Sequence, residues 1–240
     1  MAAALPAVVM AAGEGWRLRP VTERYAKPAL PIDGRPVLAT LLRELAAAGI
    51  REVALVTGHL ARQVEALAGD GSAFGLRVRT VSQPQPDGSA DAVRRAVEAG
   101  VEPPFLVTAA DTVFSAGDVE RFAAAAAGAD GAIAVRRDPP PDPEHRRAIR
   151  AFDGRVERVR DDDPSNPLSG APLWLLGPRL VPFLCVDERP YELRNTFQRG
   201  IDEGADVRAV EIGATRDLTH PVDLVNENFA YLAAFRSESP

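Results

Sequence analysis

Residues 11–20 combine small side chains with two arginines, a composition that could hold phosphate oxygens. The segment reads Ala11-Ala12-Gly13-Glu14-Gly15-Trp16-Arg17-Leu18-Arg19-Pro20. Glycines let backbone N–H groups approach an anion closely, and Arg17 and Arg19 could each grip a phosphate through two parallel hydrogen bonds. The segment is not a dinucleotide fingerprint, which needs a third glycine, nor a Walker A loop, which needs Gly-Lys-Ser/Thr. A plain structural turn is the competing interpretation of this loop taken alone.

Lysine occurs once in the chain, at position 27, among 28 basic residues. Residues 16–35 contain five basic residues against two acidic ones, although the whole chain has a net charge of −6. Lysine is a compact point charge on a flexible stem, whereas arginine is a planar fork. This basic stretch supplies the local positive field that a small polyanionic substrate needs.

Two aspartates and one glutamine stand where loops are expected. Asp111 directly follows an apolar run over residues 104–109, Gln83 opens a loop rich in proline, and Asp217 lies near the C-terminal end. Taken singly, Asp111 could cap the next element, Asp217 could be an ordinary loop residue, and Gln83 could be a solvated amide. The three histidines are scattered without the spacing of a zinc site.

Read together, these segments resemble the signature of the sugar-1-phosphate nucleotidyltransferases, the nucleotide-sugar pyrophosphorylases. The chain has Gly-x-Gly-x-Arg-Leu-Arg-Pro, then Lys27-Pro28-Ala29-Leu30-Pro31, then Gly34-Arg35-Pro36. Residues 83–92 resemble the family's Gln-x4-Gly-Thr/Ser-Ala-x-Ala loop, Ala110-Asp111 its metal-binding aspartate, and residues 217–224 its second-aspartate motif. The matches follow one order over residues 7 to about 228.

The resemblance implies a role for each matched residue. The catalytic residues would be Arg17 on the outer phosphates, Lys27 where the acceptor phosphate meets the α-phosphate, and Asp111. Gln83 and Gly88 would read the base. The full set of nucleotide-binding residues would be Ala11, Ala12, Gly13, Glu14, Gly15, Trp16, Gln83, Gly88 and Ser89.

The resemblance also implies one cofactor, Mg²⁺, held by Asp111 and Asp217. Mg²⁺ prefers hard oxygen ligands and usually takes one or two carboxylates plus substrate phosphates. Two anions must approach each other for in-line attack, so we expect the protein to supply cations and positioning. A general base is not required, because a phosphate monoester is already an anionic nucleophile near neutral pH.

The second half of the chain departs from the family pattern. Asp161 takes the place of the usual glutamate, the lysine that would bind the sugar phosphate is missing, and Gly170 lacks the usual preceding asparagine. Residues 192–195 only partly resemble the family's Glu-Ile-Thr-Asp. The expected acceptor-binding residues are therefore Asp161, Gly170 and Glu192. In the first half, Trp16 replaces a small hydroxyl residue, and it could reshape the loop or stack on a ligand.

Apolar periodicity predicts alternating strands and helices, hence a three-layer α/β/α Rossmann-like fold with a mostly parallel, mixed central sheet. Strands are expected over residues 7–11, 52–57, 76–81, 104–109, 131–135, 148–152, 156–159, 172–176 and 207–212. Helices are expected over residues 36–48, 61–68, 89–98, 117–127, 191–203 and 221–235. In such sheets ligands bind beyond the carboxyl ends of the strands.

We expect one domain over residues 1–240, with a nucleotide-binding half (1–135) and an acceptor-binding half (136–240), joined by a proline-rich connection over residues 138–145. The net charge of −6 argues against nucleic-acid or anionic membrane partners. The single cysteine, Cys185, excludes an internal disulfide and favours the cytoplasm. The expected partners are a nucleoside triphosphate and a phosphorylated small molecule, and the resemblance implies self-association into a homo-oligomer.

Three functions follow from these features. The first is transfer of a nucleoside monophosphate from an NTP to a sugar-1-phosphate, with release of pyrophosphate. The missing acceptor lysine leaves open a second, a cytidylyltransferase acting on a phosphorylated alcohol or amino-alcohol. Trp16 and the altered acceptor half leave open a third, a weakly catalytic nucleotide-binding regulatory protein.

Overall fold

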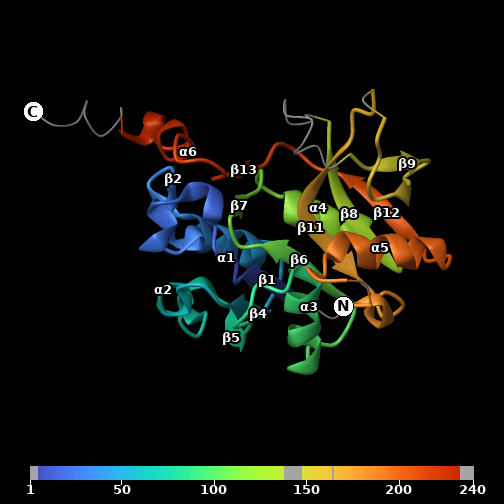
Figure 1. Cartoon of the computed structure of the whole chain (residues 1–240), viewed down its shortest axis with the longest axis horizontal. Helices are drawn as coiled ribbons and strands as arrows, with labels where there is room; N and C mark the ends of the chain where they lie inside the picture. The colour runs from blue at the N-terminus through green and yellow to red at the C-terminus, as the bar shows by residue number, and fades with distance from the viewer. Residues whose placement is uncertain (1–4, 138–147, 164, 187, 233–240) are drawn as a thin grey trace, which may run out of the picture.

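A mixed sheet forms the centre of the molecule (Figure 1). The computed structural model describes residues 5–137, 148–163, 165–186 and 188–232. Within these ranges the sheet has nine strands in the order β5-β4-β1-β6-β11-β8-β12-β10-β9. Their bounds are β1 (Ala7–Ala11), β4 (Glu52–Thr57), β5 (Arg77–Ser82), β6 (Phe105–Ala109), β8 (Gly131–Arg136), β9 (Arg150–Phe152), β10 (Arg155–Arg158), β11 (Ser169–Leu176) and β12 (Val207–Glu211).

The strands of the first half run parallel, and one strand of the second half joins the two halves. β1 pairs in parallel with β4 and β6, and β4 pairs in parallel with β5. β11 is antiparallel to both β6 and β8, and β12 is parallel to β8. The carboxyl ends of β1, β4, β5 and β6 therefore lie at one edge of the sheet, as predicted for a ligand site.

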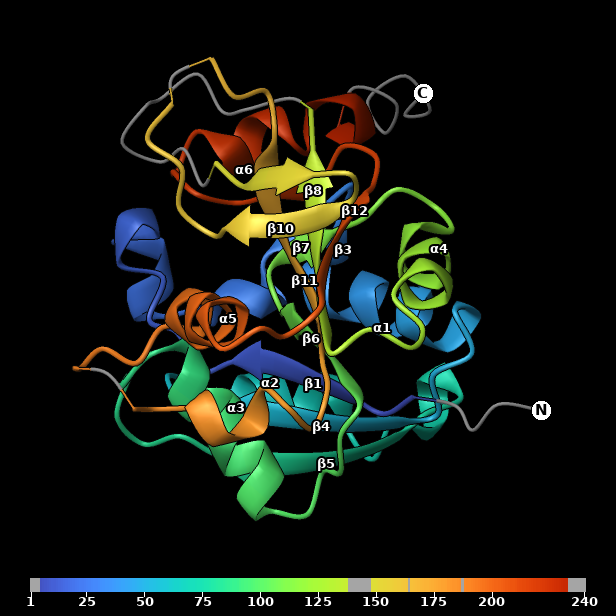
Figure 2. The same ribbon diagram turned by 90° about the vertical axis from the view of Figure 1, so that its right-hand side faces the viewer.

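Helices cover both faces of the sheet. α1 (Val37–Ala47), α2 (Ala61–Ala68) and α4 (Asp118–Ala125) pack on one face, and α3 (Ser89–Glu98) and α5 (Leu193–Asp202) pack on the other. Figure 2 shows α4 and α5 on opposite sides of β8, β11 and β12. Val8 and Val9, adjacent in β1, are both fully buried because each faces a different helical layer. The predicted three-layer α/β/α fold is confirmed.

Residues 12–36 form a compact extension beyond β1, made of three short 3₁₀ turns and the hairpin of β2 (Pro31–Ile32) and β3 (Arg35–Pro36). A small apolar cluster holds it together, and this cluster also includes Leu218 from the far end of the chain. Next to it, β7 (Thr112–Val113) pairs with β13 (Arg216–Asp217). These short pairings bring three distant segments to the carboxyl edge of the sheet.

The helix predicted over residues 221–235 is interrupted within the described residues, and residues 233–235 lie outside them. α6 spans Asp223–Asn226, a turn follows at residues 227–228, and helical residues resume at 229–232. The buried Asn228 interrupts the helix. It accepts a hydrogen bond from the Gly34 N–H at 2.8 Å and donates to the Pro31 carbonyl at 2.8 Å, which ties this segment to the β2–β3 hairpin.

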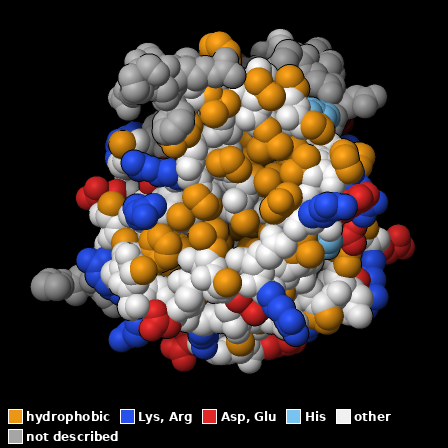
Figure 3. Space-filling view, turned by 90° about the vertical axis from the view of Figure 1, so that its left-hand side faces the viewer, with side chains coloured by type: hydrophobic (Ala, Val, Ile, Leu, Met, Phe, Trp, Pro, Cys, Tyr) orange, Lys and Arg blue, Asp and Glu red, His pale blue; other side chains and the backbone are white. Residues whose placement is uncertain are grey.

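The sequence argues against a membrane partner and predicts a proline-rich connection between the halves. Among the described residues, no helix is long and apolar enough to cross a bilayer. The whole proline-rich connection, residues 138–145, lies outside the described residues. Figure 3 shows apolar side chains gathered across the middle of one face, with charged side chains mainly toward its margin. Exposed apolar residues of the described chain include Trp16, Tyr25, Val222, Val225 and Phe229.

Candidate functional site

A cleft of about 280 Å³ opens beyond the carboxyl ends of β1 and β6. Its walls come from the glycine-rich loop, the segment around Lys27, the end of β6 and Thr219. Eight predicted site residues line it together: Ala11, Gly13, Glu14, Gly15, Trp16, Arg17, Lys27 and Asp111. Segments that are about 100 positions apart in sequence therefore meet in one polar cleft.

Gly15 shapes the glycine-rich loop. Its backbone is left-handed (φ 61°), and its carbonyl accepts hydrogen bonds from the Leu18 N–H and the Thr22 hydroxyl, each at 2.9 Å. A Cβ at Gly15 would lie 3.1 Å from Thr22 and 3.3 Å from Lys27. Gly13, in contrast, has open space where a Cβ would be, so it leaves the cleft side of the loop unobstructed. The loop is thus packed against Thr22 and Lys27 at Gly15 and has open space at Gly13.

The aromatic and basic side chains of this loop stand at the cleft mouth. Trp16 is 70% exposed, and the Arg17 guanidinium lies over its ring at 6.0 Å from the centroid. Arg19 is directed instead to Glu14, with which it forms an exposed ion pair at 3.1 Å. Arg17 is therefore the better placed of the two arginines to meet an anion in the cleft.

Lys27 and Asp111 form an ion pair within the cleft. The Lys27 Nζ donates to Oδ2 of Asp111, and their side chains are 15% and 26% exposed. Lys27 opens the third 3₁₀ turn, while Asp111 follows β6, so both positions are fixed by short structured segments. The pair places one compact cation and one carboxylate side by side on the cleft wall.

Asp217 lies on the strand next to Asp111. It is opposite Thr112 in the β7–β13 ladder, and the Thr219 hydroxyl donates to its Oδ1 at 2.7 Å. Asp217 is exposed and is not part of the cleft wall, whereas Thr219 is. Among the described residues, no group of three or more His, Cys, Asp or Glu could hold a metal ion. The β7–β13 ladder sets Asp217 opposite the residue that follows Asp111, and two carboxylates suffice for Mg²⁺ because substrate phosphates and water usually complete its shell.

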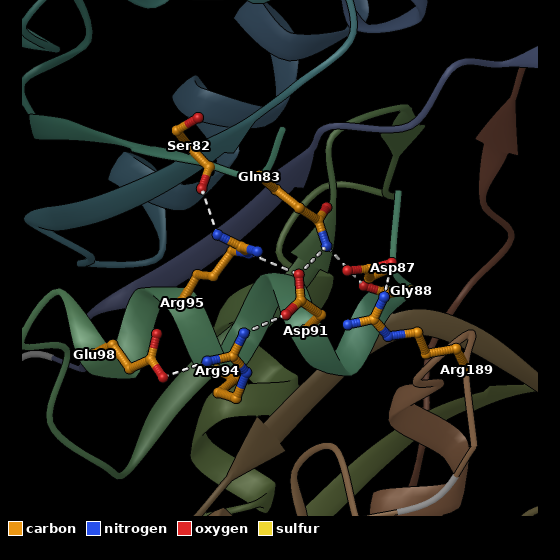
Figure 4. Close-up of polar contacts among 9 residues, drawn as sticks. All are labelled: Ser82, Gln83, Asp87, Gly88, Asp91, Arg94, Arg95, Glu98 and Arg189. Carbon is orange, nitrogen blue, oxygen red and sulfur yellow. Dashed lines mark hydrogen bonds and ion pairs between the residues drawn. The ribbon is translucent and has the colours of Figure 1, made fainter. Parts of the chain in front are cut away.

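Gln83, Gly88 and Asp91 form a second polar cluster, at the end of β5 (Figure 4). The Gln83 side-chain amide donates to the Gly88 carbonyl at 3.0 Å and to Asp91 Oδ2 at 2.9 Å. A Cβ at Gly58 would lie 2.6 Å from the Gln83 carbonyl and 2.9 Å from the Ala12 Cβ. The ends of β1, β4 and β5 are therefore in close contact, which brings this cluster beside the glycine-rich loop.

Ser89 and Glu192 connect the two halves of the chain. The Ser89 hydroxyl donates to Glu192 at 3.0 Å and accepts from the Leu193 N–H at 2.8 Å. Glu192 is the residue that precedes α5, so the first turn of that helix is fixed to the first turn of α3. Ser89, predicted to bind the nucleotide, thus lies beside Glu192, which is predicted to bind the acceptor.

The other two predicted acceptor residues lie outside the cleft wall. The Asp161 side chain is 4% exposed and accepts hydrogen bonds from Arg150 and Asn166, each at 2.7 Å. Burial alone would raise the Asp161 pKa, but these hydrogen bonds outweigh it and lower the pKa. Gly170 pairs with Val135 in the sheet, beside a register shift in β11. The geometry around Asp161 is that of an internal brace.

Thr219 and Asp91 are two polar residues of these clusters that were not predicted from the sequence. Thr219 stands two residues after Asp217, and its hydroxyl donates a hydrogen bond to that carboxylate. A hydroxyl residue two positions after an aspartate was therefore the signal available in the sequence. Asp91 lies on the buried face of α3 and is bonded by Arg94 and Arg95. An acidic residue with arginines at positions i+3 and i+4 is a recognisable helix pattern, and its burial follows from the apolar stripe of α3.

Comparison with known proteins yields consistent similarities. Residues 6–147 match the model of the Nucleotidyl transferase family. A glucose-1-phosphate thymidylyltransferase of Streptomyces griseus is 31% identical, over 93% of this chain and 65% of its own length. A CMP-5'-(3-aminopropyl)phosphonate synthase of Streptomyces rubellomurinus is 43% identical over 121 residues, which are 50% of this chain and 19% of that protein.

A solved structure shares the fold. A putative glucose-1-phosphate thymidylyltransferase from Bacillus anthracis superposes with a TM-score of 0.83 at 18% identity, covering 95% of each chain. The chain spans just under two thirds of the length of the thymidylyltransferase relative from Streptomyces griseus.

Proposed function

Because the chain belongs to the nucleotidyl transferase family, we propose that it transfers a nucleoside monophosphate from an NTP to a sugar-1-phosphate and releases pyrophosphate. The observation that carries the proposal is the Lys27–Asp111 pair in the cleft, beside a braced glycine-rich loop. The thymidylyltransferase from Streptomyces griseus supports the choice of acceptor class.

The reaction is an in-line displacement at the α-phosphorus of the NTP. An acceptor phosphate oxygen attacks, a new P–O bond forms, and the bond to the β-phosphate oxygen breaks, so that pyrophosphate leaves. Lys27 would reduce the repulsion between the two phosphates, and Arg17 would hold the outer phosphates. Backbone N–H groups of the Gly13–Gly15 loop would bind phosphate oxygens. Bound Mg²⁺, held by Asp111 and Asp217, would neutralise phosphate charge.

Gln83 and Gly88 would contact the base, and Trp16 would stand over the mouth of the cleft. Ser89 with Glu192 would join the nucleotide side to the acceptor side, which would be completed by Asp161 and Gly170. We assign the nucleotide to residues 1–135 and the acceptor to residues 136–240 of one domain. We further propose a homo-oligomeric cytoplasmic enzyme whose partners are these two small molecules.

A second acceptor class is favoured by one comparison. The 43% identity to the CMP-5'-(3-aminopropyl)phosphonate synthase falls on about half of the chain. In addition, residues 160–163 read Arg-Asp-Asp-Asp, so the usual acceptor lysine is absent. Transfer of CMP to a phosphorylated alcohol or amino-alcohol, or to an aminoalkyl phosphonate, is therefore the alternative.

The test is pyrophosphate release with each of ATP, CTP, GTP, UTP and dTTP plus Mg²⁺, against sugar-1-phosphates and phosphorylated alcohols. We expect release that depends on a sugar-1-phosphate and is lost in Asp111→Ala. Release with CTP and a phospho-alcohol alone would establish the alternative acceptor. Tight NTP binding without release across the panel would contradict the transferase proposal and favour a regulatory protein.

A further inference from the structure

We propose that Asp91 is a positioning residue that fixes the carboxamide of Gln83, so that only the Gln83 oxygen is presented to the nucleotide base. Asp91 would thereby determine which base is selected, although its own carboxylate does not contact the base. This inference rests on the proposed function, because it assumes that Gln83 meets a base.

The hydrogen bonds of Gln83 define the orientation of its amide. Nε2 donates one hydrogen to the Gly88 carbonyl at 3.0 Å and the other to Asp91 Oδ2 at 2.9 Å. Both partners are acceptors, so a reversed amide would set its oxygen against two other oxygens and lose both bonds. The residue is only 5% exposed, and its backbone N–H is bonded to the Thr57 carbonyl at 2.7 Å. Gln83 is therefore fixed both at its backbone and at its side-chain amide.

Asp91 is itself held from the opposite side (Figure 4). It is 1% exposed, its Oδ2 also accepts from Nε of Arg95 at 2.7 Å, and its Oδ1 accepts from Arg94 at 2.5 Å. Arg95 also reaches the Ser82 carbonyl at 3.4 Å, and Arg94 is bonded to Glu98 as well. Burial alone would raise the Asp91 pKa, but the bonds from Arg95, Gln83 and Arg94 lower it, so Asp91 stays an ionised acceptor.

The loop around Gly88 cannot easily move away. Asp87 and Ala90 are bonded through their backbones to Tyr191, at 2.7 and 2.8 Å. A Cβ at Gly88 would lie 2.3 Å from the Tyr191 carbonyl oxygen, and its φ of 109° is one that favours glycine. The Gly88 carbonyl is thus a fixed acceptor, like Asp91. The Gln83 amide nitrogen is fully used, and no donor among the described residues reaches its oxygen.

A fixed oxygen discriminates between two bases when one has a hydrogen-bond donor at the position where the other has an acceptor. Uracil and cytosine, or guanine and adenine, present opposite groups at the same edge, a carbonyl in one and an amino group in the other. A glutamine that could rotate its amide would suit either member of each pair. Held by Asp91, it suits the member that presents an N–H to it and leaves an unpaired acceptor against the other.

The first test is base selectivity, measured within each pair (UTP with CTP, GTP with ATP) as the ratio of kcat/KM for the preferred over the disfavoured nucleotide. In Asp91→Ala we expect the larger ratio to move toward unity by about tenfold, the effect of one charge-assisted hydrogen bond. Asp91→Asn keeps one oxygen for Gln83 and should retain most of the selectivity. Glu98→Ala, which removes the other acceptor of Arg94, should leave the ratio unchanged. A folded Asp91→Ala enzyme with wild-type ratios would overturn the inference.

A second measurement is independent of catalysis, and its readout is taken on the wild-type protein. The chain has four glutamines, at positions 63, 83, 85 and 198, so glutamine-selective ¹⁵N labelling gives four side-chain amide pairs. We expect the Gln83 pair, assigned by its loss in Gln83→Ala, to exchange with solvent at least tenfold more slowly than the Gln85 pair. Rapid exchange of Gln83 in the wild type would overturn the inference. Absence of transfer with every NTP would instead contradict the proposed function, and slow exchange would then show a clamp that serves structure alone.

Discussion

Lys27 is the single lysine among 28 basic residues, and its ammonium contacts the Asp111 carboxylate in the cleft. Its stem also packs close to Gly15, so the cation is set between the glycine-rich loop and the end of β6. An ammonium group is small enough to lie between two phosphates, whereas a guanidinium extends further and is planar. The residue type is therefore part of the proposed chemistry, and charge alone does not replace it.

Lys27→Arg should reduce kcat by roughly 10- to 100-fold, because a preorganised cation would be displaced from the reacting phosphates. The melting temperature should change little, since the side chain is partly exposed and the charge is kept. Steady-state pyrophosphate release and thermal unfolding measure the two effects. Arg24→Lys, the reverse exchange at an exposed position nearby, should leave both unchanged. A Lys27→Arg enzyme with the wild-type rate would exclude the role given to Lys27.

At the scale of elements, the ends of β1, β4 and β5 are packed through Gly58. An added Cβ would lie 2.6 and 3.0 Å from the carbonyl oxygens of Gln83 and Ala12, respectively. We expect Gly58→Ala to push these strand ends apart, lower the unfolding free energy by about 1–3 kcal/mol and raise KM for the NTP. Urea unfolding and NTP titration measure this.

The matched control for that experiment is Gly69→Ala. Gly69 has a positive φ, but an added methyl group there would meet nothing within 4 Å, so this variant reports backbone strain without steric contact. If Gly58→Ala changes KM no more than Gly69→Ala does, the close approach of the strand ends is not important for binding.

The β7–β13 ladder is a second element with a testable role. It sets Asp217 opposite Thr112, next in sequence to Asp111. We expect Asp217→Asn to raise the Mg²⁺ concentration for half-maximal rate by about tenfold, because one carboxylate would remain near the phosphates. Titration of Mg²⁺ into EDTA-treated enzyme measures this, with Glu211→Gln as a control in β12. An unchanged Mg²⁺ requirement would place Asp217 outside the metal site.

Long elements could be predicted from the sequence, but the shortest pairings could not. The apolar run of β1 and the amphipathic pattern of α1 identify their type and position directly. β7 and β13 have two residues each and no periodicity, so their pairing depends on contacts between distant segments. Similarly, the break at residues 227–228 coincides with the bonds of Asn228 to the β2–β3 hairpin, nearly 200 positions away.

In the candidate site, too, some features could be predicted from the sequence and others could not. The loop glycines, Lys27 and Asp111 follow from the sequence pattern, and the structure brings them into one cleft. Asp161 is predicted to bind the acceptor, and in the structure its carboxylate is bonded to Arg150 and Asn166. The sequence shows the charge of such a residue and cannot show which partner reaches it, because that depends on how the strand and loop segments around it pack together.

At the scale of the whole molecule, β11 joins the two halves by pairing with β6 and β8. The loop before α3 adds a second connection, through Tyr191 and the Ser89–Glu192 pair. The proposed nucleotide and acceptor sides are thus connected both in the centre of the sheet and at its carboxyl edge.

Glu44 connects the helical layer to the same edge and makes global stability depend on pH. Its carboxylate, on α1, accepts a hydrogen bond from the Phe114 N–H at 3.3 Å, just after β7. Burial raises the Glu44 pKa from 4.5 to about 7; the Phe114 bond lowers it, and the charge of Asp118 adds to the rise. Between these two values the folded protein binds more protons than the unfolded chain, so its unfolding free energy falls as pH rises.

Glu44→Gln should remove this dependence, because glutamine can keep the bond from Phe114 without a charge. We expect the unfolding free energy of the wild type to decrease by about 1–3 kcal/mol from pH 5 to pH 8 through this group, and the variant to lose that part of the slope. Urea unfolding at several pH values measures it, with the exposed Glu120→Gln as control. Equal slopes in wild type and Glu44→Gln would mean that Glu44 is already ionised at pH 5. In that case the charge would be tolerated next to Phe114 and Asp118, and α1 would contact the β7 edge through a carboxylate at pH 5 and above.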